Sequence, residues 1–266
     1  LAGVTGTQYA NYTISREEVL QREPNLKSDK LLGAGVYLDY VNNDARLVIE
    51  NIKEADELGG LMASHVKVVG VLHDDNGRIN GVKAKDLLTD EEFEIKAKMV
   101  INTTGPWVTK TLGLDDKNGE GEVIRPTKGV HLVVDSSRLR VPQPTYFDSG
   151  IGDGRMIFVV PRENKTYFGT TDTDYTGDYK HPRVEQADVD YLLKAINNRY
   201  PEAEITINDI EASWAGLRPL LSGNGSSDYN GGGSNTGKVS DESFENLIKI
   251  AVAYSKDEAS RGEVEK

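Results

Sequence analysis

The chain contains no cysteine, so disulfide bonds, thiolate catalysis and cysteine-ligated metal sites are excluded from its 266 residues. It also lacks any apolar run of the roughly 18 residues that a membrane-spanning helix needs, and we expect no transmembrane segment. Positive charge is scarce, because 31 lysines and arginines stand against 43 aspartates and glutamates and give a net charge of −12. A nucleic-acid backbone has to be neutralised by clustered basic side chains, so this balance predicts no nucleic-acid partner.

The residues that are present predict a folded protein with mixed secondary structure. Hydrophobic residues make up 37% and charged residues 28% of the chain, which is typical of a globular domain. Apolar residues at helical spacing predict helices over 14–23, 45–58 and 185–199. Alternating or continuously apolar stretches predict strands over 31–41, 65–74, 79–88, 99–102, 129–135, 144–148, 155–163, 165–171 and 205–220.

Several local signals refine these elements. Ser15, with Glu18 three residues later, forms a capping box for the first helix, and Asn43 or Asp44 caps the second. Residues 99–102 are apolar on both faces, which predicts a buried parallel strand. Residues 222–266 read as a flexible Gly/Ser/Asn-rich loop followed by a helix.

Three segments carry the chemistry. MVINTTGPWV (99–108) ends in a tight Thr-Thr-Gly turn, and TYFGTTDTDY (166–175) ends in small hydroxyl and carboxylate residues after Gly169. WAGLRPL (214–220) places Arg218 on a stiff segment between a glycine and a proline. Arginine stays charged and offers planar donors that suit phosphate or another anion. A surface ion pair with one of the many acids is the simpler interpretation of Arg218 from the residues alone.

In this order the three segments resemble the FAD-dependent glycerol-3-phosphate dehydrogenases and oxidases, which belong to the D-amino-acid-oxidase-like flavoproteins. The resemblance covers nearly the whole chain. It includes the Asp-Ala-Arg-Leu start of the helix at 44–47 and the Lys-Gly-x-His pattern at 128–131. Within the family, the polar segment after the arginine turn is most similar to the bacterial soluble alpha-glycerophosphate oxidases.

The resemblance implies roles for individual residues. Arg218 and His131 would be catalytic, since a histidine with a near-neutral pKa suits proton transfer. Arg218 would also bind substrate together with the hydroxyl groups of Thr170 and Thr171. The cofactor-binding residues it implies are Thr103, Thr104, Gly105, Trp107 and Lys128.

Simpler alternatives exist for most of these positions. Thr103–Gly105 can be an ordinary strand-to-loop turn, and His131 can be a hydrogen-bonded structural histidine. Lys128 can cap a strand edge. Asp44 and Arg46 are interpreted as structural, with Asp44 as an N-cap and Arg46 as a clamp between two domains. No metal site is expected, because Asp172, Asp174 and Asp178 lack the glycine and glutamate of a calcium loop.

The resemblance also implies a fold and an activity. The expected fold is α+β, with a partial FAD-binding domain of the glutathione-reductase or D-amino-acid-oxidase type (44–110) and an antiparallel-sheet substrate domain formed by 1–43 and 111–221. Residues 222–266 would be a flexible insertion with a helix. The implied reaction is oxidation of sn-glycerol 3-phosphate to dihydroxyacetone phosphate, with FAD as cofactor and O2 as acceptor, giving H2O2.

Other functions stay open, namely a quinone-linked dehydrogenase, a non-catalytic interaction module, or an oxidase of an amine or amino acid. The expected partners are a small phosphorylated polyol and O2 or a quinone, with a homo-oligomer as an option. We expect a cytoplasmic protein, or one peripheral to the membrane. No glycine-rich stretch matches the G-x-G-x-x-G pattern that holds an FAD pyrophosphate. The chain is therefore interpreted as the central part of a longer flavoenzyme, with weak FAD binding and no turnover alone.

Overall fold

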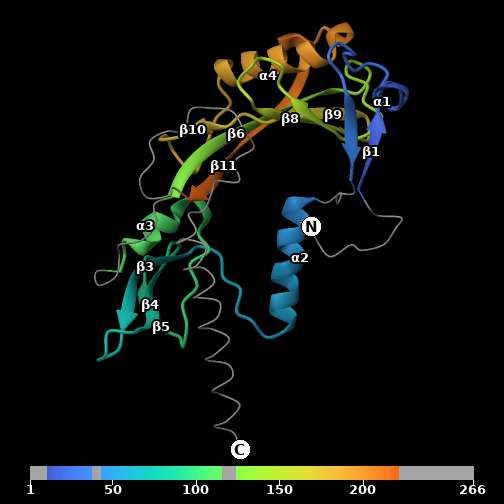
Figure 1. Cartoon of the computed structure of the whole chain (residues 1–266). Helices are drawn as coiled ribbons and strands as arrows, with labels where there is room; N and C mark the ends of the chain where they lie inside the picture. The colour runs from blue at the N-terminus through green and yellow to red at the C-terminus, as the bar shows by residue number, and fades with distance from the viewer. Residues whose placement is uncertain (1–10, 38–42, 116–123, 222–266) are drawn as a thin grey trace, which may run out of the picture. The chain divides into compact units, whose positions relative to one another are not determined.

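A computed structural model describes residues 11–37, 43–115 and 124–221 (Figure 1). The chain divides into two compact units. The first comprises residues 1–24, 28–103 and 110–120, and the second comprises 25–27, 104–109 and 121–266. The predicted domain boundaries at 43, 110 and 221 stay a prediction. The predicted loop and helix over 222–266 lie outside the described residues.

The first unit begins with a strand-helix-strand segment. Strand β1 (Tyr12–Ser15) pairs antiparallel with β2 (Gly33–Val36), and helix α1 (Arg16–Arg22) follows β1 directly. The Ser15 side chain accepts a hydrogen bond from the backbone N–H of Glu18 at 3.3 Å, as the capping box predicted. A satisfied N-terminal donor favours helix formation at this point.

Helix α2 (Asp44–Glu57) is capped by Asn43, whose side chain accepts a hydrogen bond from the N–H of Arg46 at 3.1 Å. Asp44, the alternative cap, is instead the first helical residue, where its charge faces the positive end of the helix. The guanidinium of Arg46 pairs with Glu50 one turn along the same helix. Arg46 was predicted to clamp two domains together, but among the described residues no contact of its side chain with another element is seen.

A meander of three antiparallel strands follows, formed by β3 (Val66–His73), β4 (Ile79–Asp86) and β5 (Glu92–Lys96). A turn at Asn76-Gly77 joins β3 to β4, and Gly77 has the positive φ of 79° that such turns require. His73, at the end of β3, is largely buried, and its Nε2 lies 3.0 Å from Oδ1 of Asp115.

The prediction of a strand at 99–102 is wrong. These residues form no strand, and the side chains of Met99, Val100 and Ile101 are 51%, 38% and 74% exposed. A parallel strand that is apolar on both faces needs strands beside it and helices over it. The described residues supply no such neighbours to this segment.

The second unit contains a sheet of six antiparallel strands, ordered β11-β6-β9-β8-β7, with the short β10 (Thr173–Asp174) also paired to β6. Its central strand is β6 (Ile124–Asp135), and β11 (Ile210–Leu221) pairs along nearly its whole length. The others are β7 (Thr145–Asp148), β8 (Met156–Arg162) and β9 (Lys165–Gly169). This is the antiparallel sheet that the sequence predicted.

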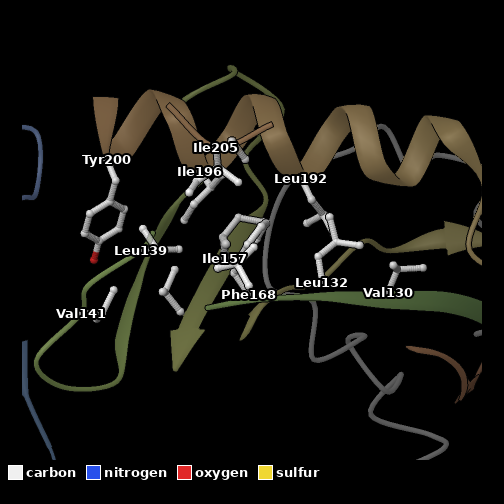
Figure 2. Packing of buried hydrophobic residues seen from close by; sticks show 13 residues of the cluster. Val130, Leu132, Leu139, Val141, Ile157, Phe168, Leu192, Ile196, Tyr200 and Ile205 are labelled. Atoms are coloured by element: carbon white, nitrogen blue, oxygen red, sulfur yellow. The ribbon is translucent and has the colours of Figure 1, made fainter. Parts of the chain in front are cut away.

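Helix α4 (Gln186–Arg199) covers one face of this sheet and closes the hydrophobic core (Figure 2). Val130 and Leu132 of β6 point up toward the helix, where Leu192 and Ile196 point down (Figure 2). All four side chains are fully buried. Burying a side chain of this size contributes about 2 kcal/mol, so the helix and the central strand hold each other in place.

Short helices complete the unit: η2 (Gly105–Trp107), η3 (Pro201–Ala203) and η4 (Ile207–Asp209). Helix α3 (Val108–Leu112) follows η2 and crosses the boundary between the units. In the part of the chain that the structure describes, no helix is long and apolar enough to cross a membrane.

Candidate functional site

The two faces of strand β6 have different chemistry. Even-numbered residues from Lys128 to Val134 lie on the side of helix α4, where Val130, Leu132 and Val134 join the core. Gly129 and His131 therefore lie on the opposite face. On that face β11 and β9 flank β6, with Trp214 and Gly169 in register with His131 on either side. The candidate site is built on this open face of the sheet.

Arg218 of β11 is held by the segment that follows β9. Its Nη2 donates to Oγ1 of Thr170 at 2.9 Å, and its Nη1 donates to the carbonyl oxygen of Thr171 at 3.2 Å. The carboxylate of Asp172 lies 3.5 Å from Nη1, and the Arg218 side chain stays 36% exposed. The guanidinium is thus fixed at two nitrogens while part of it faces solvent, which suits binding of an anion.

Gly129 makes room for this guanidinium. A Cβ at position 129 would lie 2.6 Å from Nη2 and 2.7 Å from Nη1 of Arg218, and 2.7 Å from Oγ1 of Thr170. These distances are far inside van der Waals contact, so the arginine crosses β6 only because the residue beneath it has no side chain.

This close approach yields a prediction for Gly129→Ala. The added methyl meets only the end of the arginine and one hydroxyl, so those groups will move while the fold survives. We expect kcat/KM of any reaction that depends on Arg218 to fall about a hundredfold, because displacing a positioning group by about 1 Å has that effect. Steady-state kinetics and thermal melting would check both parts.

The matched control is Gly216→Ala on β11, where an added Cβ would meet nothing within 4 Å. It should leave kcat/KM and the melting temperature unchanged. Equal losses in the two variants would show that the methyl group acts through the backbone and not through Arg218.

The imidazole of His131 is packed among aromatic rings. It stacks on Trp214 with ring centroids 4.9 Å apart and planes 14° from parallel, and it meets Tyr167 edge-on at 5.9 Å. Gly169 again provides the space, since a Cβ there would lie 2.6 Å from Cδ2 of His131. Burial and then the nearby charge of Arg218 lower the pKa of His131 from 6.5 to about 4. The ring is therefore neutral at physiological pH.

The lowered pKa of His131 predicts a pH-dependent stability. Below pH 6.5 the unfolded chain takes up a proton on this histidine that the folded chain does not bind until about pH 4. Acidification from pH 6.5 to 4 therefore weakens folding, by about 3 kcal/mol for this group. Urea unfolding of the wild type and of His131→Asn across this range should show curves that converge as the pH falls, because the variant lacks this loss. Parallel curves would contradict the prediction.

Thr170 and Thr171 lie with Arg218, as the sequence led us to expect of a shared site. The hydroxyl of Thr170 donates to the carbonyl oxygen of Thr171 at 3.0 Å while it accepts from Arg218. The hydroxyl of Thr171 is buried and donates to the carbonyl oxygen of Lys128 at 3.2 Å. Both hydroxyl groups thus hold the sheet and the arginine in place. Because Thr171 is buried, only the hydroxyl group of Thr170 is accessible to a ligand bound by Arg218.

Lys128 lies on the opposite face of β6, toward helix α4, and its predicted contact with the cofactor stays a prediction. Its side chain is 3% exposed, and Nζ lies 2.7 Å from the carboxylate of Asp188 and 3.2 Å from that of Glu185 at the start of α4. Burial lowers the pKa of this ammonium, but hydrogen bonds to Asp188 and Glu185 outweigh it, so the pKa is raised and the charge is retained. The side chain joins β6 to α4.

The Thr-Thr-Gly turn is divided between the two units. Thr103 belongs to the first, while Thr104, Gly105 and Trp107 belong to the second. Gly105 has a φ of 55° and starts η2, which lies beside β11, the strand that carries Arg218. Trp107 contacts Tyr179 at a centroid distance of 6.2 Å. A Cβ on Gly105 would meet nothing within 4 Å, so the backbone there is open to a ligand.

Sequence reasoning missed Gly129 and the aromatic partners of His131. A glycine inside a strand is a signal of close approach by another group, and both Gly129 and Gly169 stand inside apolar strand patterns. Trp214 and Tyr167 could be placed on the same face as His131 only if the pairing register of β6 with β9 and β11 were already known.

Comparison with known proteins identifies the family. The model of the FAD dependent oxidoreductase family, DAO, matches residues 3–247. The chain belongs to this family. It is 63% identical to the alpha-glycerophosphate oxidase of Streptococcus pneumoniae over 265 residues, which cover 100% of this chain and 43% of that protein. The alpha-glycerophosphate oxidase of Enterococcus casseliflavus is also 63% identical, over 266 residues with the same coverage.

A solved structure of a DAO-family relative shows the same fold. The glycerol-3-phosphate dehydrogenase from Bacillus halodurans, complexed with FAD, superposes with a TM-score of 0.71 at 45% identity. The match covers 79% of this chain and 42% of that one. The predicted family, its dependence on FAD and its mixed fold with antiparallel sheets are thus confirmed. The chain spans less than half the length of these relatives, 43% in the curated oxidases.

Proposed function

We propose that this chain supplies the substrate-facing part of an enzyme that oxidises sn-glycerol 3-phosphate to dihydroxyacetone phosphate. The observation that supports this most is the pairing, on one face of the sheet, of a fixed guanidinium with a neutral imidazole. The substrate class comes from the names of the relatives, which are glycerophosphate oxidases and a glycerol-3-phosphate dehydrogenase.

Arg218 binds the anionic substrate in this proposal. The chain carries a net charge of −12, so a phosphomonoester needs a local cation to approach. The guanidinium is fixed before the substrate arrives, because Thr170 and Thr171 hold two of its nitrogens. A cation that is already positioned loses little conformational entropy when it binds its ligand. The remaining N–H groups are available to substrate oxygens.

His131 acts as the proton acceptor in this proposal. Oxidation of a secondary alcohol to a ketone removes a proton from the hydroxyl oxygen and a hydride from the carbon that bears the hydroxyl. A neutral imidazole can accept the proton, and the lowered pKa of His131 keeps the ring neutral. The charge of Arg218 that contributes to this lowering also stabilises negative charge that develops on the substrate oxygen.

FAD, when bound, supplies the acceptor for the hydride. The open backbone at Gly105, in the turn beside β11, fits a flat ring at close approach. Trp107 follows in the same turn, and Thr103 precedes it in the other unit. We therefore keep Thr104, Gly105 and Trp107 as residues that would contact the ring, and the contact predicted for Thr103 stays a prediction. Lys128 would act only through the strand that it anchors.

We propose O2 as the electron acceptor, with H2O2 as the product, because the most similar curated proteins are named oxidases. A quinone is the alternative, in keeping with the dehydrogenase among the relatives. A cytoplasmic location, peripheral membrane attachment and a homo-oligomer stay parts of the proposal that the described residues do not address.

The test uses a full-length enzyme that contains this sequence. The purified protein should show a flavin spectrum, which anaerobic glycerol 3-phosphate should bleach while glycine and sarcosine should not. In air, H2O2 should form in proportion to the glycerol 3-phosphate consumed. A colourless protein would favour an interaction module, bleaching by glycine or sarcosine would favour an amine or amino-acid oxidase, and turnover only with an added quinone would favour the dehydrogenase.

A further inference from the structure

Three rings from neighbouring strands meet on the open face of the sheet. Tyr167 of β9, His131 of β6 and Trp214 of β11 lie side by side, with Tyr167 and Trp214 also 5.4 Å apart between centroids. The two flanking rings differ in geometry. Tyr167 meets the imidazole edge-on, whereas Trp214 lies nearly parallel to it.

Trp214 confines the imidazole of His131 from one side. The two residues are register partners in the β6–β11 pair, which sets the short distance between their rings. On the other side of His131, the bare backbone of Gly169 lies close under Cδ2. The imidazole therefore lies between an indole face and a strand backbone, and its plane is set by both.

Packing alone does not account for this tryptophan. Trp214 is 46% exposed and is absent from the hydrophobic core cluster of the unit. An indole in that position contributes little to core burial, so its main contact among the described residues is the pair of rings beside it.

We propose that Trp214 is a positioning residue for the reaction proposed above: its indole fixes the plane of the His131 ring and shields one face of that ring from water. The inference rests on the proposed role of His131 as proton acceptor. In this proposal Trp214 sets the direction in which the proton-accepting nitrogen of His131 points. It also assigns to Trp214 part of the burial that keeps the ring neutral.

The sign of the effect follows from the groups around His131. The charged group that acts on it is Arg218 of β11, and the titratable group in ring contact is Tyr167 of β9. Both remain in a Trp214→Ala variant. Removal of the indole admits water, which favours the protonated ring, so the pKa of His131 should rise from about 4 toward 6.5.

The first measurement does not depend on turnover. Diethylpyrocarbonate acylates neutral imidazole, and peptide mass spectrometry reports the rate at each histidine of the full-length enzyme. His131 should react slowly in the wild type and in Trp214→Phe, and several times faster in Trp214→Ala. The pH midpoint of its reaction should also rise in Trp214→Ala. His181, whose side chain is 74% exposed, serves as the internal control and should react equally in all three proteins.

The second measurement is the pH profile of turnover. In Trp214→Ala, kcat should fall about tenfold with little change in KM, because orientation is lost while Arg218 still binds the anion. The acidic limb of the profile should move to higher pH, and Trp214→Phe should restore both. Unchanged acylation at His131 and an unmoved acidic limb in Trp214→Ala would overturn the inference.

The His131→Asn variant separates this failure from failure of the proposed function. If His131→Asn keeps wild-type kcat, the histidine is not the proton acceptor and the proposed function fails with the inference. If His131→Asn is inactive while Trp214→Ala retains the wild-type profile, the proposed function stands and only the assignment of Trp214 is wrong.

Discussion

Replacing Arg218 by leucine should lower kcat/KM for glycerol 3-phosphate about a thousandfold in a full-length enzyme that contains this sequence. The guanidinium is already oriented by Thr170 and Thr171, and hydrogen bonds between charged partners contribute about 1.5–3 kcal/mol each. The substitution removes at least one such bond and leaves the substrate anion without a counter-charge. Arg218→Lys should recover part of the loss, since lysine keeps the charge but not the planar geometry.

Two comparisons make this result specific. Arg140→Leu removes an exposed arginine of the same unit and should leave kcat/KM within about twofold, because exposed charges contribute little. The loss in Arg218→Leu should also be much smaller for an uncharged alcohol than for glycerol 3-phosphate. Equal losses for both substrates would show that Arg218 does not bind the phosphate group.

Replacing Lys128 by methionine should destabilise the second unit by about 3 kcal/mol. The ammonium is 3% exposed and pairs with Asp188, which is 6% exposed, so the substitution leaves a buried carboxylate without its counter-charge. Asp188 still accepts a hydrogen bond from the backbone N–H of Glu185, which keeps the loss toward the lower end for a broken buried pair. Unfolding followed by urea titration would measure it.

Lys165→Met is the matched control for this substitution. Lys165 also contacts two carboxylates, those of Asp135 and Glu211, but its side chain is 34% exposed. Solvent screens that cluster, so its loss should destabilise the unit much less than the loss of Lys128 does. Adding Asp188→Asn to Lys128→Met should recover most of the stability. If the two lysine variants lose the same amount, burial does not set the strength of the Lys128 pair.

Much of the fold could be predicted because local chemistry decided it. The Ser15 capping box and the Asn76-Gly77 turn each satisfy backbone groups within a few residues, so no distant partner was needed. The antiparallel strands of the second unit show the period of two that places one face in the core. The apolar segment at 99–102 failed for the opposite reason, because a buried parallel strand depends on neighbours outside its own sequence.

The candidate site was predictable in part. Lys128 has the same strand parity as the buried Val130 and Leu132, so the period of two already indicates that it faces the core side. The resemblance of the Lys-Gly-x-His pattern to a cofactor site took precedence over that signal. Close approach at Gly169 could be predicted, but the atoms that approach Gly129 and Gly169 could not, because they come from strands distant in sequence.

The exposed apolar surface of the first unit has a consequence for the behaviour of this chain in solution. Helix α2 buries no residue in the described structure, and Leu47, Val48, Ile49 and Ile52 are 42–57% exposed. The apolar side chains at 99–101 are 38–74% exposed. Separate molecules of the chain attract one another through such patches, while the net charge of −12 keeps them apart. Salt shortens the range of that repulsion to about 10 Å at 0.1 M. The isolated chain is therefore expected to aggregate as the ionic strength rises and to stay monomeric in dilute buffer.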